Sequence, residues 1–168
     1  MTISSLLNNA RTVQAELSRG SIIGSVLEGH EADIIELQRK QLFEGKGSDG
    51  NDLRPYYTED LKPDGWFTTR QKAENYMAWK QSINYPVNVQ RNPNAPNLYI
   101  TGIFHNDLGV RFDADSVAVV PDTAYAAKIM GKYGMNVFGL SSAKWSEIFN
   151  ERGAKDELIM KMKDILWQ

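Results

Sequence analysis

Few residues of this chain have the chemistry that a catalytic site requires. The 168 residues include no cysteine, which excludes thiolate nucleophiles, disulfides and cysteine-ligated zinc. His30 and His105 are the only histidines, and therefore the only imidazole groups that could act as general bases. His30 has helical spacing with Leu27 before it and Ile34 after it. Such a position is typical of the edge of a helical core, so we do not expect catalysis at His30.

His105 is a second possibility, because aspartates follow it closely in the sequence: Asp107, Asp113 and Asp115. Imidazole and carboxylate groups bind zinc and manganese, so a metal-dependent hydrolase centred on His105, Asp107 and Asp113 is one alternative. The spacing of these residues does not fix a ligand set. We therefore interpret them as a solvated turn with carboxylates at the strand ends, and predict no metal, cofactor or catalytic residue.

The loop that follows Phe43 carries oxygen donors that could suggest calcium: Asp49, Asn51, Asp52 and Glu59. An EF-hand needs an oxygen donor at the fifth position and glycine at the sixth. Counted from Asp49, these positions hold Leu53 and Arg54, so the match fails.

A Gly-x-x-Gly pattern formed by Gly131 and Gly134 encloses Lys132 and is similar to the loop of RNA-binding KH domains. The pattern alone is weak, and we expect a turn there. The chain has 19 basic and 21 acidic residues, a net charge of −2, which argues against a dedicated nucleic-acid binder. A nucleic-acid-associated protein that uses Lys128 and Lys132 stays open as an alternative.

Periodic apolar residues indicate the helices that would position these groups. Helical spacing predicts one helix from about residue 3 to 17, a stop at Gly20, and a second helix beyond it that reaches Leu37. Thr68 and Gln71 have the spacing of a capping box at the start of a third helix. Short apolar stripes predict further helices over 123–130, after Ser141, and after Gly153.

Alternating residues indicate a β-hairpin. Val110 and Phe112 alternate with polar residues, as do Val117 and Val119, and Ala114-Asp115 lies between the two runs. We therefore predict a hairpin with one apolar face.

Hydrophobic residues make up 42% of the chain, which is enough for one core. We predict a single α+β domain over residues 1–168: a small antiparallel β-sheet with an N-terminal helical hairpin and C-terminal helices. The predicted segments are a helical hairpin (1–43), a loop (44–67), a helix (68–83), an extended arm (84–97), a hairpin-containing core (98–140) and C-terminal helices (141–168). Neither a signal peptide nor a membrane-spanning run is visible, so we expect a protein of the cytosol.

Two blocks of sequence resemble a known family. Residues 41–62 read QLFEGKGSDGNDLRPYYTEDLK, a Gly/Asp loop followed by aromatic residues and a Thr/Lys-containing stretch. Residues 98–140 begin with Leu-Tyr-Ile-Thr-Gly, continue through the hairpin and Tyr125-Ala126, and end in Val-Phe-Gly-Leu, with Ser141 next. In this order the motifs resemble the tail-completion proteins of tailed bacteriophages, also called neck, head–tail joining or virion-morphogenesis proteins.

The resemblance implies a structural virion protein without enzymatic activity. It implies a head–tail connector or tail-completion subunit that oligomerises with itself as a ring between portal and tail. The implied partners are portal or adaptor and tail proteins, with packaged DNA as an incidental contact and no membrane. The implied location is the virion, assembled in the host cytoplasm.

A ring subunit needs projecting loops and exposed aromatic side chains at its contacts. The candidate interface residues flank the two irregular segments: Tyr56, Tyr57, Trp66, Phe67 and Tyr85. Because residues 44–52 and 84–97 contain few apolar side chains, we expect both to be mobile in the free subunit and ordered after assembly.

Overall fold

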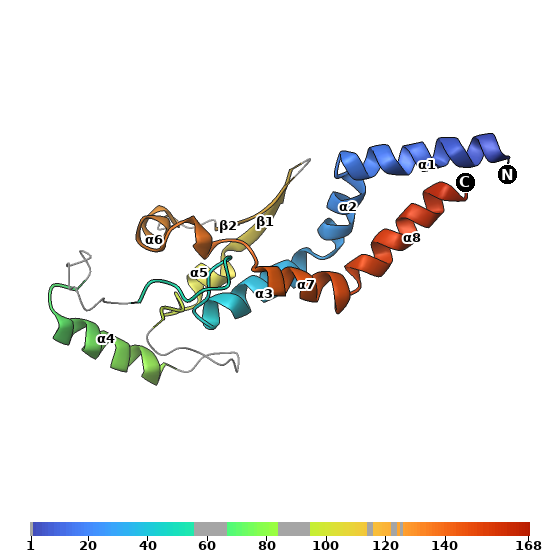
Figure 1. Cartoon of the computed structure of the whole chain (residues 1–168). Helices are drawn as coiled ribbons and strands as arrows, with labels where there is room; N and C mark the ends of the chain where they lie inside the picture. The colour runs from blue at the N-terminus through green and yellow to red at the C-terminus, as the bar shows by residue number, and fades with distance from the viewer. Residues whose placement is uncertain (1, 56–66, 84–94, 114–115, 122–123, 125) are drawn as a thin grey trace.

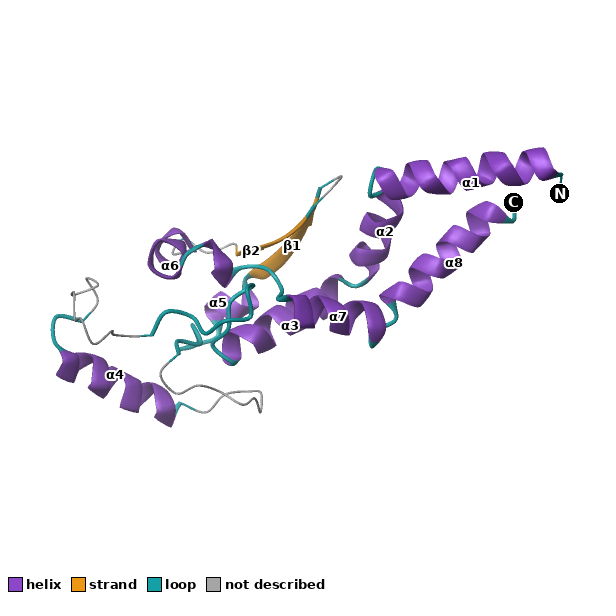
Figure 2. Ribbon diagram, in the orientation of Figure 1, coloured by secondary structure: helices purple, strands orange, loops and turns teal. Residues whose placement is uncertain are grey.

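The computed structural model of the chain describes residues 2–55, 67–83, 95–113, 116–121, 124 and 126–168. Helices at both ends of the chain flank a two-stranded antiparallel sheet, so the predicted α+β class is confirmed (Figure 2). In chain order (Figure 1), the elements are α1 (Ile3–Ser18), α2 (Ser21–Gly29), α3 (Glu31–Phe43), α4 (Arg70–Ser82), α5 (Ile103–Asn106), β1 (Leu108–Phe112), β2 (Val117–Pro121), α6 (Ala126–Tyr133), the 3-10 helix η1 (Met135–Val137), α7 (Ser142–Asn150) and α8 (Ala154–Leu166).

Helices α1, α2 and α8 form a helical arm that extends away from the rest of the molecule (Figure 1). α1 begins with a capping box, in which the side chains of Thr2 and Ser5 accept from each other's backbone N–H groups. Gly20, with φ of 73°, lets the chain turn sharply between α1 and α2. α8 returns along α1, and Asn9 Nδ2 donates to the Leu166 carbonyl at 3.2 Å. The arm therefore holds the two chain ends together.

The predicted second helix is divided into two, which corrects the predicted helical hairpin. α2 ends at Gly29, and His30, with φ of −104° and ψ of 18°, separates it from α3. Glycine inside a helix is less favourable than alanine by about 1 kcal/mol, and both Gly24 and Gly29 fall in this segment. The break directs α2 toward α8 in the arm, while α3 packs against α7.

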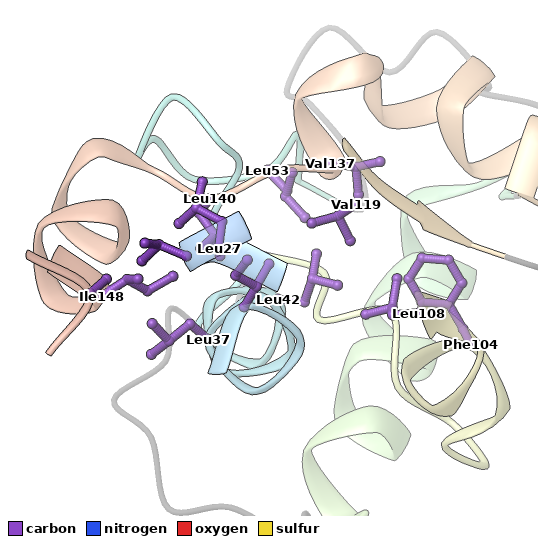
Figure 3. Close-up of a cluster of buried hydrophobic side chains, with 13 residues drawn as sticks. Leu27, Leu37, Leu42, Leu53, Phe104, Leu108, Val119, Val137, Leu140 and Ile148 are labelled. Atoms are coloured by element: carbon purple, nitrogen blue, oxygen red, sulfur yellow. The ribbon is translucent and has the colours of Figure 1, made fainter. Parts of the chain in front are cut away.

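The body of the molecule is built around α3. Ile34, Leu37 and Leu42 on this helix have no exposed surface, and they join a cluster that reaches the sheet, η1 and α7 (Figure 3). Removing a large apolar side chain from water contributes roughly 1.5–3 kcal/mol. The cluster comprises Val26, Leu27, Ile34, Leu37, Leu42, Leu53, Phe104, Leu108, Val119, Val137, Leu140, Ile148 and Ala154.

The predicted hairpin is confirmed, and its two strands pair in a defined register. Val110 lies opposite Val119, and Phe112 lies opposite Val117, so apolar pairs face each other across the strands. Residues 114–115, the predicted turn, lie outside the described residues. β1 also contacts α3, which joins the sheet to the body.

Residues 44–52, predicted to be a mobile arm, are instead held against the body. Ser48 N–H donates to the Asn136 carbonyl at 2.6 Å, and Leu53 N–H donates to the Gly45 carbonyl at 2.7 Å. Leu53 is buried in the core cluster. The prediction of mobility was based on the small number of apolar residues inside the loop. Backbone hydrogen bonds and Leu53, which follows the loop, hold it in place.

The boundaries of α4 and α6 differ by a few residues from the predicted ones. α4 has Thr69 rather than Thr68 as its N-cap, and Thr69 accepts from Lys72 N–H at 3.3 Å. α6 starts at Ala126, later than the predicted 123, and it includes Gly131 inside the helix. In the predicted arm at 84–97, only residues 95–97 are described, and they are buried.

The predicted C-terminal helices are confirmed. α7 follows Ser141 as its N-cap, and α8 follows Gly153, whose φ is 92°. α7 already ends at Asn150, so Gly153 introduces α8 rather than ending α7.

Candidate assembly surfaces

His105 lies inside the body, which corrects its interpretation as part of a solvated turn. Its side chain is only 2% exposed. The ring packs against Phe43 at a centroid separation of 4.4 Å and against Tyr99 at 5.5 Å. Asn106, the next residue, is exposed. The polarity of the neighbouring residues therefore gave no indication that His105 is buried.

The protonation state of His105 follows from its hydrogen bond. Nε2 lies 2.9 Å from the Asn97 carbonyl, which can only accept, so Nε2 carries the proton and Nδ1 is an acceptor. Nδ1 is buried and meets no hydrogen-bond donor among the described residues. Burial lowers the pKa of His105 to about 4, although the hydrogen bond to Asn97 opposes that change. His105 is therefore a neutral structural residue at neutral pH.

Among the described residues, Asp107 and Asp113 do not join His105 in a metal site. Asp113 Oδ2 accepts from Arg111 Nε at 3.2 Å on an exposed part of the hairpin, and Asp115 lies outside the described residues. Within the described ranges, no three His, Asp or Glu side chains converge as metal ligands would.

Asp49 stabilises its own loop. Its carboxylate accepts from the backbone N–H of Asn51 at 3.0 Å, and from the side-chain amides of Asn51 and Asn136. The hydrogen bonds from Asn51, led by that of its backbone, lower the pKa of Asp49. This carboxylate therefore holds a turn.

Charged residues meet where the arm joins the body, and we call them the junction cluster: His30, Asp33, Glu36, Glu147, Arg152 and Glu157. Arg152 donates to Asp33 at 2.8 Å, to Glu36 at 3.0 and 3.1 Å, and to Glu147 at 3.3 Å. Its hydrogen bond to Glu36 is the main cause that lowers the pKa of that carboxyl and raises the pKa of Arg152. His30 Nδ1 lies 2.8 Å from Asp33 Oδ2, and its Nε2 lies 3.6 Å from Glu157 Oε2. His30 is thus a residue of the junction, placed between carboxylates of α3 and α8.

Two buried glutamines on α3 were missed by the sequence analysis. Gln38 Nε2 donates to the Val137 carbonyl at 3.2 Å. Gln41 Nε2 donates to the Gly139 carbonyl at 2.9 Å, and its Oε1 accepts from Ser141 N–H at 2.8 Å. With helical spacing from Ile34, both glutamines occupy positions where an apolar stripe would continue, and that signal could have identified them.

An apolar groove opens between α4, α6 and residues 96–104, and we call it the lysine groove. Its volume is about 380 Å³, and Ile100 and Ile103 are exposed side chains along it. Lys80, Lys128 and Lys132 also line it, and no lining residue within the described ranges is acidic. The groove is therefore suited to an apolar partner that carries negative charge.

A tight turn shapes one wall of this groove. Leu98 has φ of 54°, a left-handed conformation that is uncommon for a residue with a branched side chain. The turn is held by Tyr99, whose N–H donates to Asn97 Oδ1 at 3.2 Å and whose carbonyl accepts from the buried ammonium of Lys80. Gly102 has φ of 86°, and a Cβ there would lie 3.2 Å from the Tyr99 ring. These constraints present Leu98 and Ile100 to the groove.

Of the predicted interface aromatics, Phe67 is the one that the structure describes. It is half-buried at the groove, where its ring lies 5.1 Å from that of Tyr76 and 5.5 Å from Lys132 Nζ. Tyr56, Tyr57, Trp66 and Tyr85 lie outside the described residues. Interface use of the five aromatics stays a prediction.

Large apolar side chains are exposed on the arm. On α8, Met160 is 63% exposed, and Trp167, the C-cap residue that follows the helix, is 68% exposed. Their spacing of seven residues places them on one side of the helix, which we call the outer face of α8. Asp156 and Asp164 flank them, and Lys163 lies at the margin of the same exposed face. On α1, Ile3 and Leu7 are also exposed.

Comparison with known proteins finds no matching family, no matching curated protein and no matching solved structure. Among the helices that the structure describes, none combines the length and the apolar character needed to cross a lipid bilayer.

Proposed function

We propose that this protein is a structural subunit of a tailed-bacteriophage neck, which oligomerises as a ring between portal and tail. The observation that carries the proposal is the presence of two unlike apolar surfaces, the lysine groove and the outer face of α8, on different parts of the molecule. A subunit in a ring contacts its two neighbours through two different surfaces. Exposed apolar surfaces of this kind commonly mark sites of interaction.

The positions of the resembling blocks support the proposal. Residues 41–62 and 98–140 are separated in the sequence, but their described parts meet in the body. Gln41 from the first block binds the Gly139 carbonyl in the second, and Ser48 binds the Asn136 carbonyl. The motifs that resemble the neck proteins therefore belong to one packed unit.

Inactivation of the gene in its phage tests the proposal. We expect DNA-filled heads and complete tails that fail to join, seen by electron microscopy of lysates, and joining restored by the wild-type chain supplied in trans. Normal infectious particles without the protein would contradict the proposed function.

The lysines of the groove favour one other function, a nucleic-acid-associated protein. Lys128 and Lys132 line the groove from α6. Retention on DNA that weakens steeply between 50 and 200 mM salt would favour this function. Weak retention without a salt slope would favour the ring subunit.

A further inference from the structure

We infer that the outer face of α8 of one copy docks into the lysine groove of the next copy, a contact that rests on the proposed ring and names its interface. The two surfaces lie at opposite ends of the molecule, with α8 at one end and α4 and α6 toward the other (Figure 1). One chain cannot bring them together. Their contact is therefore between copies and joins unlike surfaces, as a closing ring requires.

The chemistry of the two surfaces is complementary. The outer face presents Met160 and Trp167, with Asp156 one turn before Met160 and Asp164 between the two apolar residues in the sequence. The groove presents apolar walls with the exposed Lys128, and its described lining has no acid that would repel the aspartates. Lys163 lies at the margin of the outer face. Because one lysine is set against two aspartates, the face is negatively charged overall. Apolar anchors with opposite charges around them are the usual composition of a helix bound in a groove.

The groove is large enough for an aromatic anchor. Its volume is about 380 Å³, and its walls include Ile103 and Tyr133. A tryptophan buries roughly 150–250 Å² and is among the residues enriched at the energetic centre of interfaces. A stable interface buries about 800 Å² on each partner, so Trp167 would be the anchor of a larger contact.

Two substitutions of exposed side chains test the contact. Trp167→Asp changes the outer face, and Ile103→Asp, at a side chain 53% exposed, changes the groove. By sedimentation velocity over a concentration series, we expect the wild type to form closed oligomers and each variant to associate at least tenfold more weakly. Met135→Asp is the matched control, because Met135 is 71% exposed and lies outside both surfaces. Thermal melts of all variants confirm that they fold.

Mixing the two variants gives the sharpest result. The Trp167→Asp chain keeps an intact groove and the Ile103→Asp chain keeps an intact outer face, so an equimolar mixture should form one-to-one dimers and nothing larger. A mixture that stays monomeric, variants that oligomerise like the wild type, or a wild type that is monomeric throughout would overturn the contact.

The joining experiment separates this contact from the proposed function. Loss of head–tail joining without the gene, combined with variants that still oligomerise, would reject the contact and keep the function. Dispersed variants, combined with normal joining in the absence of the gene, would keep the contact and reject the function.

Discussion

At the scale of single residues, buried polar groups hold together segments that are far apart in the sequence. His105 and Gln41 both bind backbone groups that no helix or strand would otherwise pair. A buried backbone group that loses its partner costs about 1–3 kcal/mol, so each side chain is important for stability. His105→Ala should therefore destabilise the fold, which would not be expected of a residue in a solvated turn.

The neutral state of His105 predicts an acid-sensitive fold. An unfolded histidine titrates near 6.5, whereas the pKa of His105 is about 4. Between these values the unfolded chain binds more protons, so the stability from this residue is complete above about pH 6.5 and declines as the pH falls toward 4. Each unit of difference between the unfolded and folded pKa corresponds to about 1.4 kcal/mol. Over that pH range, the free energy of unfolding therefore falls by roughly 3 kcal/mol.

Urea unfolding of the wild type and His105→Gln from pH 4 to 7 measures this effect. Glutamine retains an N–H donor for the Asn97 carbonyl but does not titrate. We expect the variant to be less stable at pH 7 and to show a weaker dependence on pH. Parallel pH profiles of the two proteins would show that another group causes the acid sensitivity.

Gln41→Leu should lower the free energy of unfolding by about 1–3 kcal/mol, because Ser141 N–H and the Gly139 carbonyl lose their partner. Gln14→Leu on the exposed side of α1 is the control and should change it by less than about 0.5 kcal/mol. Chemical denaturation provides both values. Equal effects at the two positions would mean that the buried amide contributes little.

The burial of individual polar residues depends on their surroundings in the fold, and the sequence indicates those surroundings only in part. Gln38 and Gln41 continue the helical stripe of Ile34 and Leu37, and this spacing could have placed them inside. For His105, no comparable signal was available. Its burial depends on Phe43 and Tyr99, which reach it from other segments.

At the scale of elements, the junction between arm and body is crossed twice by the chain. One crossing is at Gly29 and His30, and the other is at Gly153. Arg152 lies beside the second crossing and binds Asp33 and Glu36 of α3. The ion pairs of the junction cluster therefore help the packing to hold the arm in its orientation relative to the body.

Arg152→Met should destabilise the protein by about 1 kcal/mol at low salt, because it removes a partly exposed network and leaves carboxylates close together. The loss should shrink at 1 M salt, where the Debye length is about 3 Å. Arg111→Met, which removes an exposed pair with Asp113, is the control and should have little effect. Thermal unfolding at both salt concentrations checks the prediction, and a salt-independent loss would point to packing of the arginine stem.

Hydrogen exchange tests the packed loop. In the isolated protein, the amides of Ser48 and Leu53 should exchange slowly, because each donates to a backbone carbonyl. The amide of Ser4, in the first turn of α1, has no intrahelical acceptor and should exchange quickly. Fast exchange at Ser48 and Leu53 would restore the original expectation of a mobile segment.

The periodic elements could be predicted from the sequence, and their interruptions could not. Alternation of Val110, Phe112, Val117 and Val119 sets the hairpin register, because one strand face must be buried. The division at His30 depends on how α2 and α3 pack against different partners. That choice is made by the tertiary structure, so local propensity alone did not indicate the break.

At the scale of the whole molecule, the arm and the groove give the protein two ends of different character. The chain termini lie together at the far end of the arm (Figure 1), and the lysine groove is lined by residues of α4, α6 and the 96–104 turn. The sequence order of motifs suggested a ring subunit, but it could not place these surfaces. Trp167 and Ile103 are far apart in the chain, and only the fold assigns them to separate ends.

Under the proposed function, cryo-electron microscopy of a phage head–tail junction assembled with this protein tests the ring most directly. We predict a ring of identical subunits between portal and tail into which the described structure fits, with each arm reaching the neighbouring copy. A junction whose density is fully explained by other proteins, with no ring of this chain, would contradict the account.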